Sequence, residues 1–388
     1  MPHRAYLDWN ASAPLCDAAR QACVAALDVA ANPSSVHGEG RRARQLVEAA
    51  RRQVATLANA RPEHVFFTSG ATEAAAMLLT PHWRMGRAPL AMSKLYICEA
   101  DHPCLLNGGR FDASDIVRIG VNQDGLVDLE ALAAALAEHD RQQGLALVAI
   151  HLANNETGVI QPAAEIAALT RRAGGVLVLD AVQAAGRIPL DMAAGLADYL
   201  ILSSHKIGGP KGAGAVVAAA DLMMPAPLIT GGGQEKGHRA GTENVPAIAG
   251  FGAAAAQAGD VEAAAPRMAL VRERIEAAVQ KAAPGATIYG ALAPRVANTS
   301  FFSLPGVKAE TAQIAFDLAG VAVSAGSACS SGRVGPSHVL KAMGFGDNAG
   351  AVRVSVGPQT SLVEIELFEQ ALAALTRRAP GSEKTQAA

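Results

Sequence analysis

One lysine of this chain stands where an amine could react with a bound carbonyl compound. Lys206 follows the apolar run 199–202 and precedes Gly208 and Gly209. At the mouth of a sheet, partial removal from water lowers the pKa of a lysine. Such an amine can form a Schiff base. A solvated turn residue is the alternative for a single lysine near glycines, so the assignment depends on the rest of the chain.

Two further loops place polar groups where apolar runs end. The loop 68–73 opens a helix, so its backbone N–H groups and the Thr72 hydroxyl could hold a phosphate. Asp180 ends the run 175–179, and Gln183 follows it. A carboxylate at that place can pair with the protonated ring nitrogen of a bound pyridine. Helix capping explains Thr72 and Asp180 about equally well.

Four more side chains are candidates with open alternatives. Asn155, in the turn 154–158, offers an amide to a ring hydroxyl or simply forms the turn. His102 could lie over a flat ring or be a surface residue, and His205 could contact phosphate or be structural. Arg353 stands among apolar residues and needs a carboxylate partner, either an internal one or a substrate.

Cys329 is the one cysteine that the sequence marks as reactive. It lies among small residues and glycines in 324–336, a composition that predicts an exposed, mobile loop. Its alternative is a small residue that fills a turn. The chain has five cysteines, an odd number, without zinc-type spacing, which argues against a disulfide framework or a structural metal. The other four are expected to be buried and inert: Cys16, Cys23, Cys98 and Cys104.

Composition restricts the class of partner. The net charge of −2 over 388 residues gives no excess of basic residues that would attract nucleic acid or an anionic membrane. A small-molecule substrate is therefore expected. No apolar run approaches the roughly 20 residues of a membrane span, and the first residues lack the apolar core of a signal peptide. These features predict a cytoplasmic protein.

Elements that could position these residues follow from the hydrophobic pattern. Apolar runs typical of buried strands cover 65–68, 95–98, 145–152, 175–179, 199–202 and 214–217, and helical patterns cover 41–58, 128–139 and 163–173. This alternation predicts an α/β fold with a mostly parallel sheet between helices, and ligands bind where such strands end. A helix at 260–283 then leads to strands near 298–304, 321–324 and 351–356 and helices at 309–318 and 362–376, a smaller α+β domain. The polar tail 377–388 is expected to fray.

The ordered set of motifs resembles the cysteine desulfurases of the NifS and IscS kind, within the class V aminotransferase group of pyridoxal-phosphate enzymes. The motifs run from Tyr6 to about Gly357 and comprise 6–8, 32–37, 68–73, 154–158 with 161–162, 180–183, 203–212, 239–242 and 324–332. The resemblance implies the fold-type I architecture, with a seven-stranded-type sheet in a large domain (14–258). It also implies that residues 1–13 join 259–376 in the small domain.

The resemblance further implies a role for each matching residue. Lys206 would hold pyridoxal 5'-phosphate, His102 would stack on its ring, and Asp180 would pair with its ring nitrogen. Asn155 and Gln183 would contact the ring and its hydroxyl. The phosphate would be held by Ala71, Thr72, Ser203 and His205, and by Thr242 of a neighbouring subunit, which implies a homodimer. Arg353 and Asn155 would hold the substrate carboxylate.

The implied activity is conversion of L-cysteine to L-alanine, with sulfur carried on Cys329 as a persulfide to an acceptor such as an iron-sulfur scaffold protein. The Lys206 amine, or a nearby histidine such as His102, would remove the α-proton of the substrate. Trp9 and Cys104 depart from the usual pattern of the family, and Cys104 places a second thiol near the site, where oxidation or an off-path persulfide is conceivable.

Three alternatives are weaker. A selenocysteine lyase or a small-acid aminotransferase would use Lys206 and Asp180 without needing Cys329 in a mobile loop. A nicotinamide dehydrogenase would need a G-x-G-x-x-G turn after the first strand, which the sequence lacks. A scaffold protein that had lost activity would be expected to have lost Lys206 or Cys329.

Overall fold

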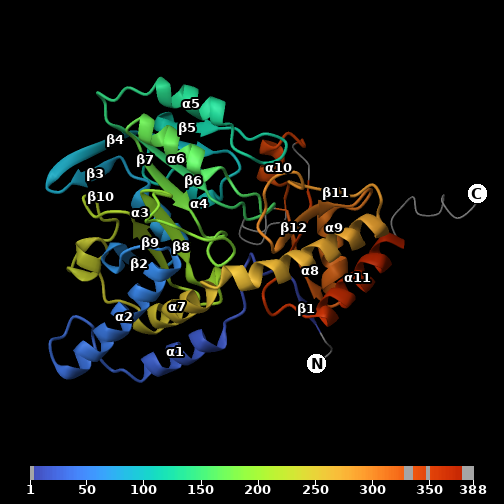
Figure 1. Ribbon diagram of the computed structural model, residues 1–388, viewed down its shortest axis with the longest axis horizontal. Helices are drawn as coiled ribbons and strands as arrows, with labels where there is room; N and C mark the ends of the chain where they lie inside the picture. Colours follow the sequence, from blue (N-terminus) through green and yellow to red (C-terminus); the bar gives the residue numbers. More distant parts are fainter. Residues whose placement is uncertain (1–3, 327–334, 347–349, 378–388) are drawn as a thin grey trace, which may run out of the picture.

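The computed structural model describes residues 4–326, 335–346 and 350–377. Over these ranges it has a large mixed sheet covered by helices, and a smaller sheet with its own helices (Figure 1). Cys329 and the tail from 378 onwards lie outside the described residues, so the predictions for them stay predictions.

The large sheet has seven central strands in the order β5-β4-β6-β7-β8-β9-β2. Their bounds are β2 (Val65–Thr68), β4 (Ala88–Cys98), β5 (Ile116–Ile119), β6 (Leu145–His151), β7 (Val176–Asp180), β8 (Tyr199–Ser203) and β9 (Gly214–Ala218). Only β9 pairs antiparallel with both of its neighbours, so the other six run in one direction. The predicted mostly parallel, seven-stranded type of sheet is confirmed. Two short strands that the sequence did not predict, β3 (His82–Met85) and β10 (Met223–Pro225), extend it at the start of β4.

Continuous apolar strands arise because both faces of this sheet are covered. In β6, Val148 and Ile150 belong to one hydrophobic core, while Leu147 and Ala149 belong to a second core on the opposite face. A slip of one residue in the pairing would exchange the two sets. The hydrophobic pattern therefore fixes the register that brings the strand ends into line.

Helices contribute to both cores (Figure 1). The first core receives α1 (Asp17–Leu27), α2 (Gly38–Leu57), α5 (Leu129–Ala137), α6 (Ala163–Arg172) and α7 (Val245–Ala258). The second receives α3 (Ala71–Leu78) and α4 (Pro103–Leu106). The predicted helices at 41–58, 128–139 and 163–173 are present with slightly different ends. No helix in the described ranges is long and apolar enough to cross a lipid bilayer.

A smaller antiparallel sheet follows in the order β11-β12-β15-β14. Its strands are β11 (Thr287–Ile288), β12 (Thr299–Ser303), β14 (Ser324–Ala325) and β15 (Val352–Ser355), and it is accompanied by α8 (Val261–Ala282), α9 (Ala309–Leu318), α10 (His338–Ala342) and α11 (Leu362–Arg377). The N-terminal strand β1 (Ala5–Tyr6) pairs parallel with β13 (Val321–Ala322). Ala5 and Leu7 are buried in the core of this part. Division of the chain into domains at residues 14 and 258 stays a prediction.

Candidate active site

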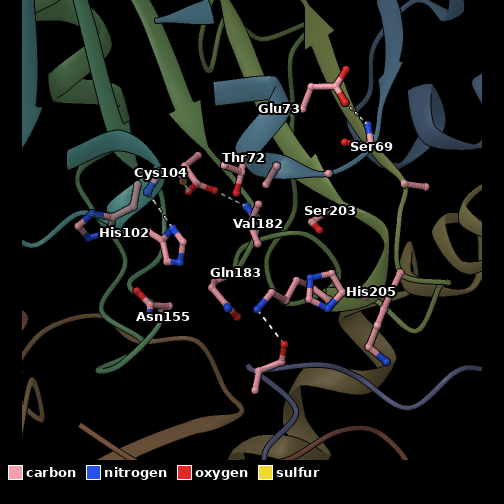
Figure 2. Close-up of a pocket in the computed structure, with 18 of the residues that line it drawn as sticks. Ser69, Thr72, Glu73, His102, Cys104, Asn155, Val182, Gln183, Ser203 and His205 are labelled. Atoms are coloured by element: carbon pink, nitrogen blue, oxygen red, sulfur yellow. Dashed lines mark hydrogen bonds between the residues drawn. The ribbon is translucent and has the colours of Figure 1, made fainter. Parts of the chain in front are cut away.

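A cavity of about 550 Å³ opens at the carboxyl ends of the central strands (Figure 2). This volume lies within the range typical of small-molecule sites. Among the side chains that line it are most of those singled out from the sequence: Ala71, Thr72, His102, Asn155, Asp180, Gln183, Ser203, His205, Lys206 and Arg353. The tertiary structure thus brings together residues that are up to 282 positions apart, from Ala71 to Arg353.

Lys206 ends a short 3₁₀ turn that directly follows β8. Its Nζ donates hydrogen bonds to the backbone oxygens of Asn10, at 2.7 Å, and Ala11, at 3.0 Å. Lys206 is one of the residues that line the cavity. The N-terminal segment therefore contributes directly to the surroundings of the amine.

Asp180 is a buried carboxylate at the end of β7, with 6% of its surface exposed. Its Oδ1 accepts a hydrogen bond from the Val182 N–H at 3.0 Å. Burial and the nearby charge of Asp101 raise the pKa of Asp180 to a net value of about 6. The hydrogen bond from Val182 and the nearby His151 and Lys206 act in the opposite direction and lower it. Within the described ranges this carboxylate has no ion pair, so the site can accept a cationic group there.

His102 precedes the first turn of α4, and its Nδ1 accepts a hydrogen bond from the Cys104 N–H at 3.2 Å. Burial, together with the nearby Lys206 and His338, lowers the pKa of His102 to about 4. At neutral pH the ring is therefore uncharged, with its proton on Nε2. A flat, neutral imidazole suits stacking on an aromatic ring.

A second group of residues in the cavity lining suits an anion. Ala71 and Thr72 begin α3, and the first backbone N–H groups of a helix have no acceptor within the helix. Ser203, His205 and Lys211 line the same cavity. Burial, with Lys206 and Lys211, lowers the pKa of His205 to about 4, so this ring is neutral at pH 7. The helix N-terminus and Lys211 thus supply positive potential.

Glu73 stabilises the loop before α3 by reaching back over it. Its carboxylate accepts the Ser69 N–H at 2.9 Å and pairs with Arg239 Nε at 3.1 Å. Hydrogen bonds from these two residues outweigh burial and lower the pKa of Glu73. This arrangement fixes the loop 69–72, which lines the cavity.

Sequence reasoning missed a buried histidine and aspartate beside Asp180. His151 lines the cavity and lies opposite Asp180 in the pairing of β6 with β7. Its Nδ1 is 2.5 Å from Oδ1 of the fully buried Asp101. The available signal was position: like Asp180, His151 ends an apolar strand of the parallel sheet.

Arg353 lies in β15 with 2% of its surface exposed. Its Nη1 donates to the backbone oxygen of Asn155 at 2.9 Å, and its Nη2 lies 2.8 Å from Asp8 Oδ1. The buried Nε has no partner within the described ranges. The internal carboxylate that the sequence left open is therefore Asp8, and the N–H of Nε is a donor that these contacts leave unused.

Two predicted site residues are not placed in this cavity. Thr242 lines a separate small cavity of about 140 Å³, which shares Ser69 and Gly212 with the main one. Its predicted contact with the phosphate of a neighbouring subunit involves a second chain and stays a prediction. Cys329 falls outside the described residues.

The side chains present fit pyridoxal 5'-phosphate. Asp180, which is buried and has no ion pair among the described residues, matches a protonated ring nitrogen. Gln183 Oε1 is buried and has no hydrogen-bond partner among the described residues, as expected of a group that meets a ring hydroxyl. Asp180 and Gln183 thus match the ring nitrogen and the ring hydroxyl of the cofactor. The amine of Lys206 matches its aldehyde, and the anion-binding start of α3 matches its phosphate.

The seven-stranded sheet, with a lysine at the end of β8 facing the cavity, is the architecture of fold-type I enzymes. The sequence model of the class V aminotransferases matches residues 5–368. A protein named cysteine desulfurase from Cereibacter sphaeroides is 38% identical over 95% of both chains. A solved NifS-like protein from Rickettsia africae is 33% identical, with a TM-score of 0.86 over 97% of this chain and all of that one. A solved structure described as SspA in complex with cysteine is 26% identical, with a TM-score of 0.74 over 92% of this chain and all of that one.

The chain belongs to the class V aminotransferase family, and within it to the cysteine desulfurases. Members of this family depend on pyridoxal phosphate.

Proposed function

We propose that this protein is a pyridoxal-phosphate-dependent cysteine desulfurase, which converts L-cysteine to L-alanine and transfers the sulfur to Cys329 as a persulfide. The observation that carries the proposal is that a buried carboxylate and a lysine amine share one cavity. The buried carboxylate of Asp180 and the amine of Lys206 line the same 550 Å³ space. An amine that shares a cavity with a carboxylate lacking an ion pair within the described ranges suits a cofactor that has an aldehyde and a basic ring nitrogen.

Bound pyridoxal phosphate would supply an electron sink that stabilises negative charge at the substrate α-carbon. The Lys206 amine would hold the cofactor, and Asp180 would keep a proton on its ring nitrogen. His102 would stack on the ring as a neutral imidazole, while Gln183 and Asn155 would contact the ring and its hydroxyl. The phosphate would be held by Ala71, Thr72, Ser203 and His205, with Thr242 donated by a second copy of the chain.

Lys206 is also the group best placed to move the α-proton. Carbonyl oxygens of Asn10 and Ala11 orient its Nζ at the edge of the cavity. Once released from the cofactor, the amine can accept a proton from the substrate α-carbon and return it at another carbon. His102 is less suited to this step, because its Nδ1 already accepts a backbone N–H and its Nε2 carries the proton.

Arg353 and Asn155 would hold the substrate carboxylate. The Nε of Arg353, which has no partner in the part of the chain that the structure describes, can donate to a carboxylate oxygen, and such charge-assisted hydrogen bonds are stronger than neutral ones. Because Asp8 already pairs with Nη2, the guanidinium would be shared between an internal and an incoming carboxylate. This sharing keeps the arginine in place before the substrate arrives.

Sulfur transfer requires a thiolate. Cys329 would attack the substrate sulfur, forming the S–S bond of a persulfide while the substrate C–S bond breaks. The electron pair of the broken bond remains with the carbon skeleton, which takes up a proton and leaves as alanine. The persulfide would then pass to an acceptor protein such as an iron-sulfur scaffold. A cytoplasmic homodimer completes the proposal.

Comparison of the wild type with Cys329→Ala tests this function. Both proteins, with Cys16→Ala as a thiol control outside the cavity, are mixed with L-cysteine and a thiol reductant. Cofactor absorbance, alanine and sulfide are followed together. The wild type and the control should release both products, whereas Cys329→Ala should change the cofactor spectrum but release little of either. Full turnover by Cys329→Ala would replace the persulfide route with direct elimination by a lyase.

A further inference from the structure

The thiol of Cys104 lies in the wall of the cavity against the carboxylate of Asp180. Its Sγ donates a hydrogen bond to Asp180 Oδ2 at 3.8 Å. Cys104 lines the cavity, and Figure 2 shows it beside His102. None of the roles described so far uses this thiol.

Both oxygens of Asp180 are therefore held, and by different parts of the fold. Oδ1 receives the N–H of Val182, which follows the same strand, and Oδ2 receives the thiol from α4. No other side chain in the described ranges donates to this carboxylate. Each oxygen can accept more than one hydrogen bond, so an acceptor site remains toward the cavity.

This thiol stays protonated. Burial, reinforced by the negative charges of Asp180 and Asp101, raises the pKa of Cys104 far above its ordinary value. A thiol without thiolate character is a poor nucleophile. Cys104 is therefore suited to donate a hydrogen bond, and the off-path persulfide considered from the sequence is disfavoured at this position.

We propose that Cys104 is a positioning residue, whose thiol holds the Asp180 carboxylate in the orientation that pairs with the ring nitrogen of pyridoxal phosphate. The inference rests on the proposed function, because it presupposes that cofactor. The other charged or titratable groups that act on Asp180 are Asp101, His151 and Lys206. They are unchanged in every variant below, so differences between variants report on the Cys104 contact.

The test compares Cys104→Ala, Cys104→Ser and the control Cys16→Ala with the wild type. For each apoprotein, the dissociation constant for pyridoxal phosphate is measured by equilibrium dialysis, and the absorbance band of the bound cofactor is recorded at one pH. Cys104→Ala should bind the cofactor about threefold to fivefold more weakly, the range expected for one weak hydrogen bond. Its absorbance band should also shift. Cys104→Ser keeps a donor and should stay within twofold of the wild type, as should Cys16→Ala.

Iodoacetamide labelling of the native wild type provides a readout independent of activity. Cys104 should remain unlabelled until the protein unfolds. Rapid labelling of Cys104 would overturn the proposal, and so would cofactor affinity in Cys104→Ala within twofold of the wild type. Equal weakening in the alanine and serine variants would indicate packing instead of donation and would also overturn it. A wild type that binds no pyridoxal phosphate would overturn the proposed function itself, whereas a binding wild type with an unaffected Cys104→Ala removes only the role of Cys104.

Discussion

Arg353 and Asp8 form a largely buried ion pair, with 2.8 Å between Nη2 and Oδ1, that joins the N-terminal segment to the last strand of the small sheet. Ser324 Oγ donates to the same carboxylate oxygen and accepts from Arg353 at 3.1 Å. The group proposed to bind the substrate is thus fixed by residues at both ends of the chain. A buried charge that is already paired costs less to present to an incoming carboxylate than an unpaired one.

Replacement of Arg353 by lysine should raise KM for L-cysteine about tenfold or more. The lysine ammonium is a compact charge, whereas the arginine guanidinium is planar and has several N–H donors. Lysine therefore cannot contact Asp8 and a second carboxylate in the same geometry. Steady-state kinetics of alanine formation measure the change. The control is Arg274→Lys, which alters a two-point pair with Glu369 in α11 and should leave KM unchanged. An unaltered KM in Arg353→Lys would exclude this residue from substrate binding.

Loss of the Lys206 amine should remove turnover almost completely. Lys206→Ala lacks both the group that holds the cofactor and the proposed proton carrier, so alanine formation should fall about a thousandfold or more. Lys281→Ala, which changes a lysine of α8 outside the cavity, serves as the control. Turnover by Lys206→Ala close to that of the control would contradict the assignment.

Stability of the apoprotein should depend on pH through Asp180. The folded state raises the pKa of this carboxyl from 3.8 to about 6, so folding favours its protonated form. Between these two values the folded state binds more protons than the unfolded state, and this group lowers the free energy of unfolding as pH rises. By pH 8 the penalty reaches about 3 kcal/mol.

The variant Asp180→Asn removes that penalty. Its apoprotein should melt at a higher temperature than the wild type at pH 8, and the difference should shrink toward pH 5. Thermal melts of both apoproteins across this range measure the effect. A difference that does not vary with pH would show that the Asp180 pKa is not raised. In the same variant, affinity for pyridoxal phosphate should fall, because the negative partner of the ring nitrogen is gone.

Ser337 should contribute measurably to stability, because its hydroxyl has two partners. It caps α10 by accepting the Leu340 N–H at 3.0 Å and donates to Oε2 of the buried Glu156 at 2.5 Å. Burial raises the pKa of Glu156, and the Ser337 hydrogen bond opposes that rise. Ser337→Ala should lower the free energy of unfolding by about 1–3 kcal/mol in urea denaturation. Ser337→Thr retains a hydroxyl and should lose less, and equal losses in the two variants would argue against the hydrogen bonds.

Much of the architecture was predictable because it depends on local pattern. Apolar runs such as 145–152 and 199–202 are typical of strands covered on both faces, and the structure confirms them as β6 and β8. Short strands with mixed polarity were missed. In β3, with sequence His82-Trp83-Arg84-Met85, only the tryptophan is buried, so neither alternation nor a continuous apolar run reveals it.

Candidate side chains such as Asp180 and Lys206 were identified from the sequence because parallel strands end at one edge of a sheet, where polar residues after apolar runs must gather. The partners of these side chains were not identifiable. His151 with Asp101, Asp8 with Arg353, and Cys104 with Asp180 are pairs 50, 345 and 76 positions apart. Residue type at one position carries no information on which distant group will meet it.

The sequence by itself therefore determined most of the strand and helix pattern and the family resemblance, and it supplied the predicted set of reactive side chains. Only the tertiary structure decided the electrostatics of the site: that His102 and His205 are neutral, that Asp180 is buried without an ion pair among the described residues, and that Arg353 is shared with Asp8. The physical reason is that local structure follows from periodicity along the chain. A pKa depends on burial and on charges a few ångströms away, which the packing of distant segments sets.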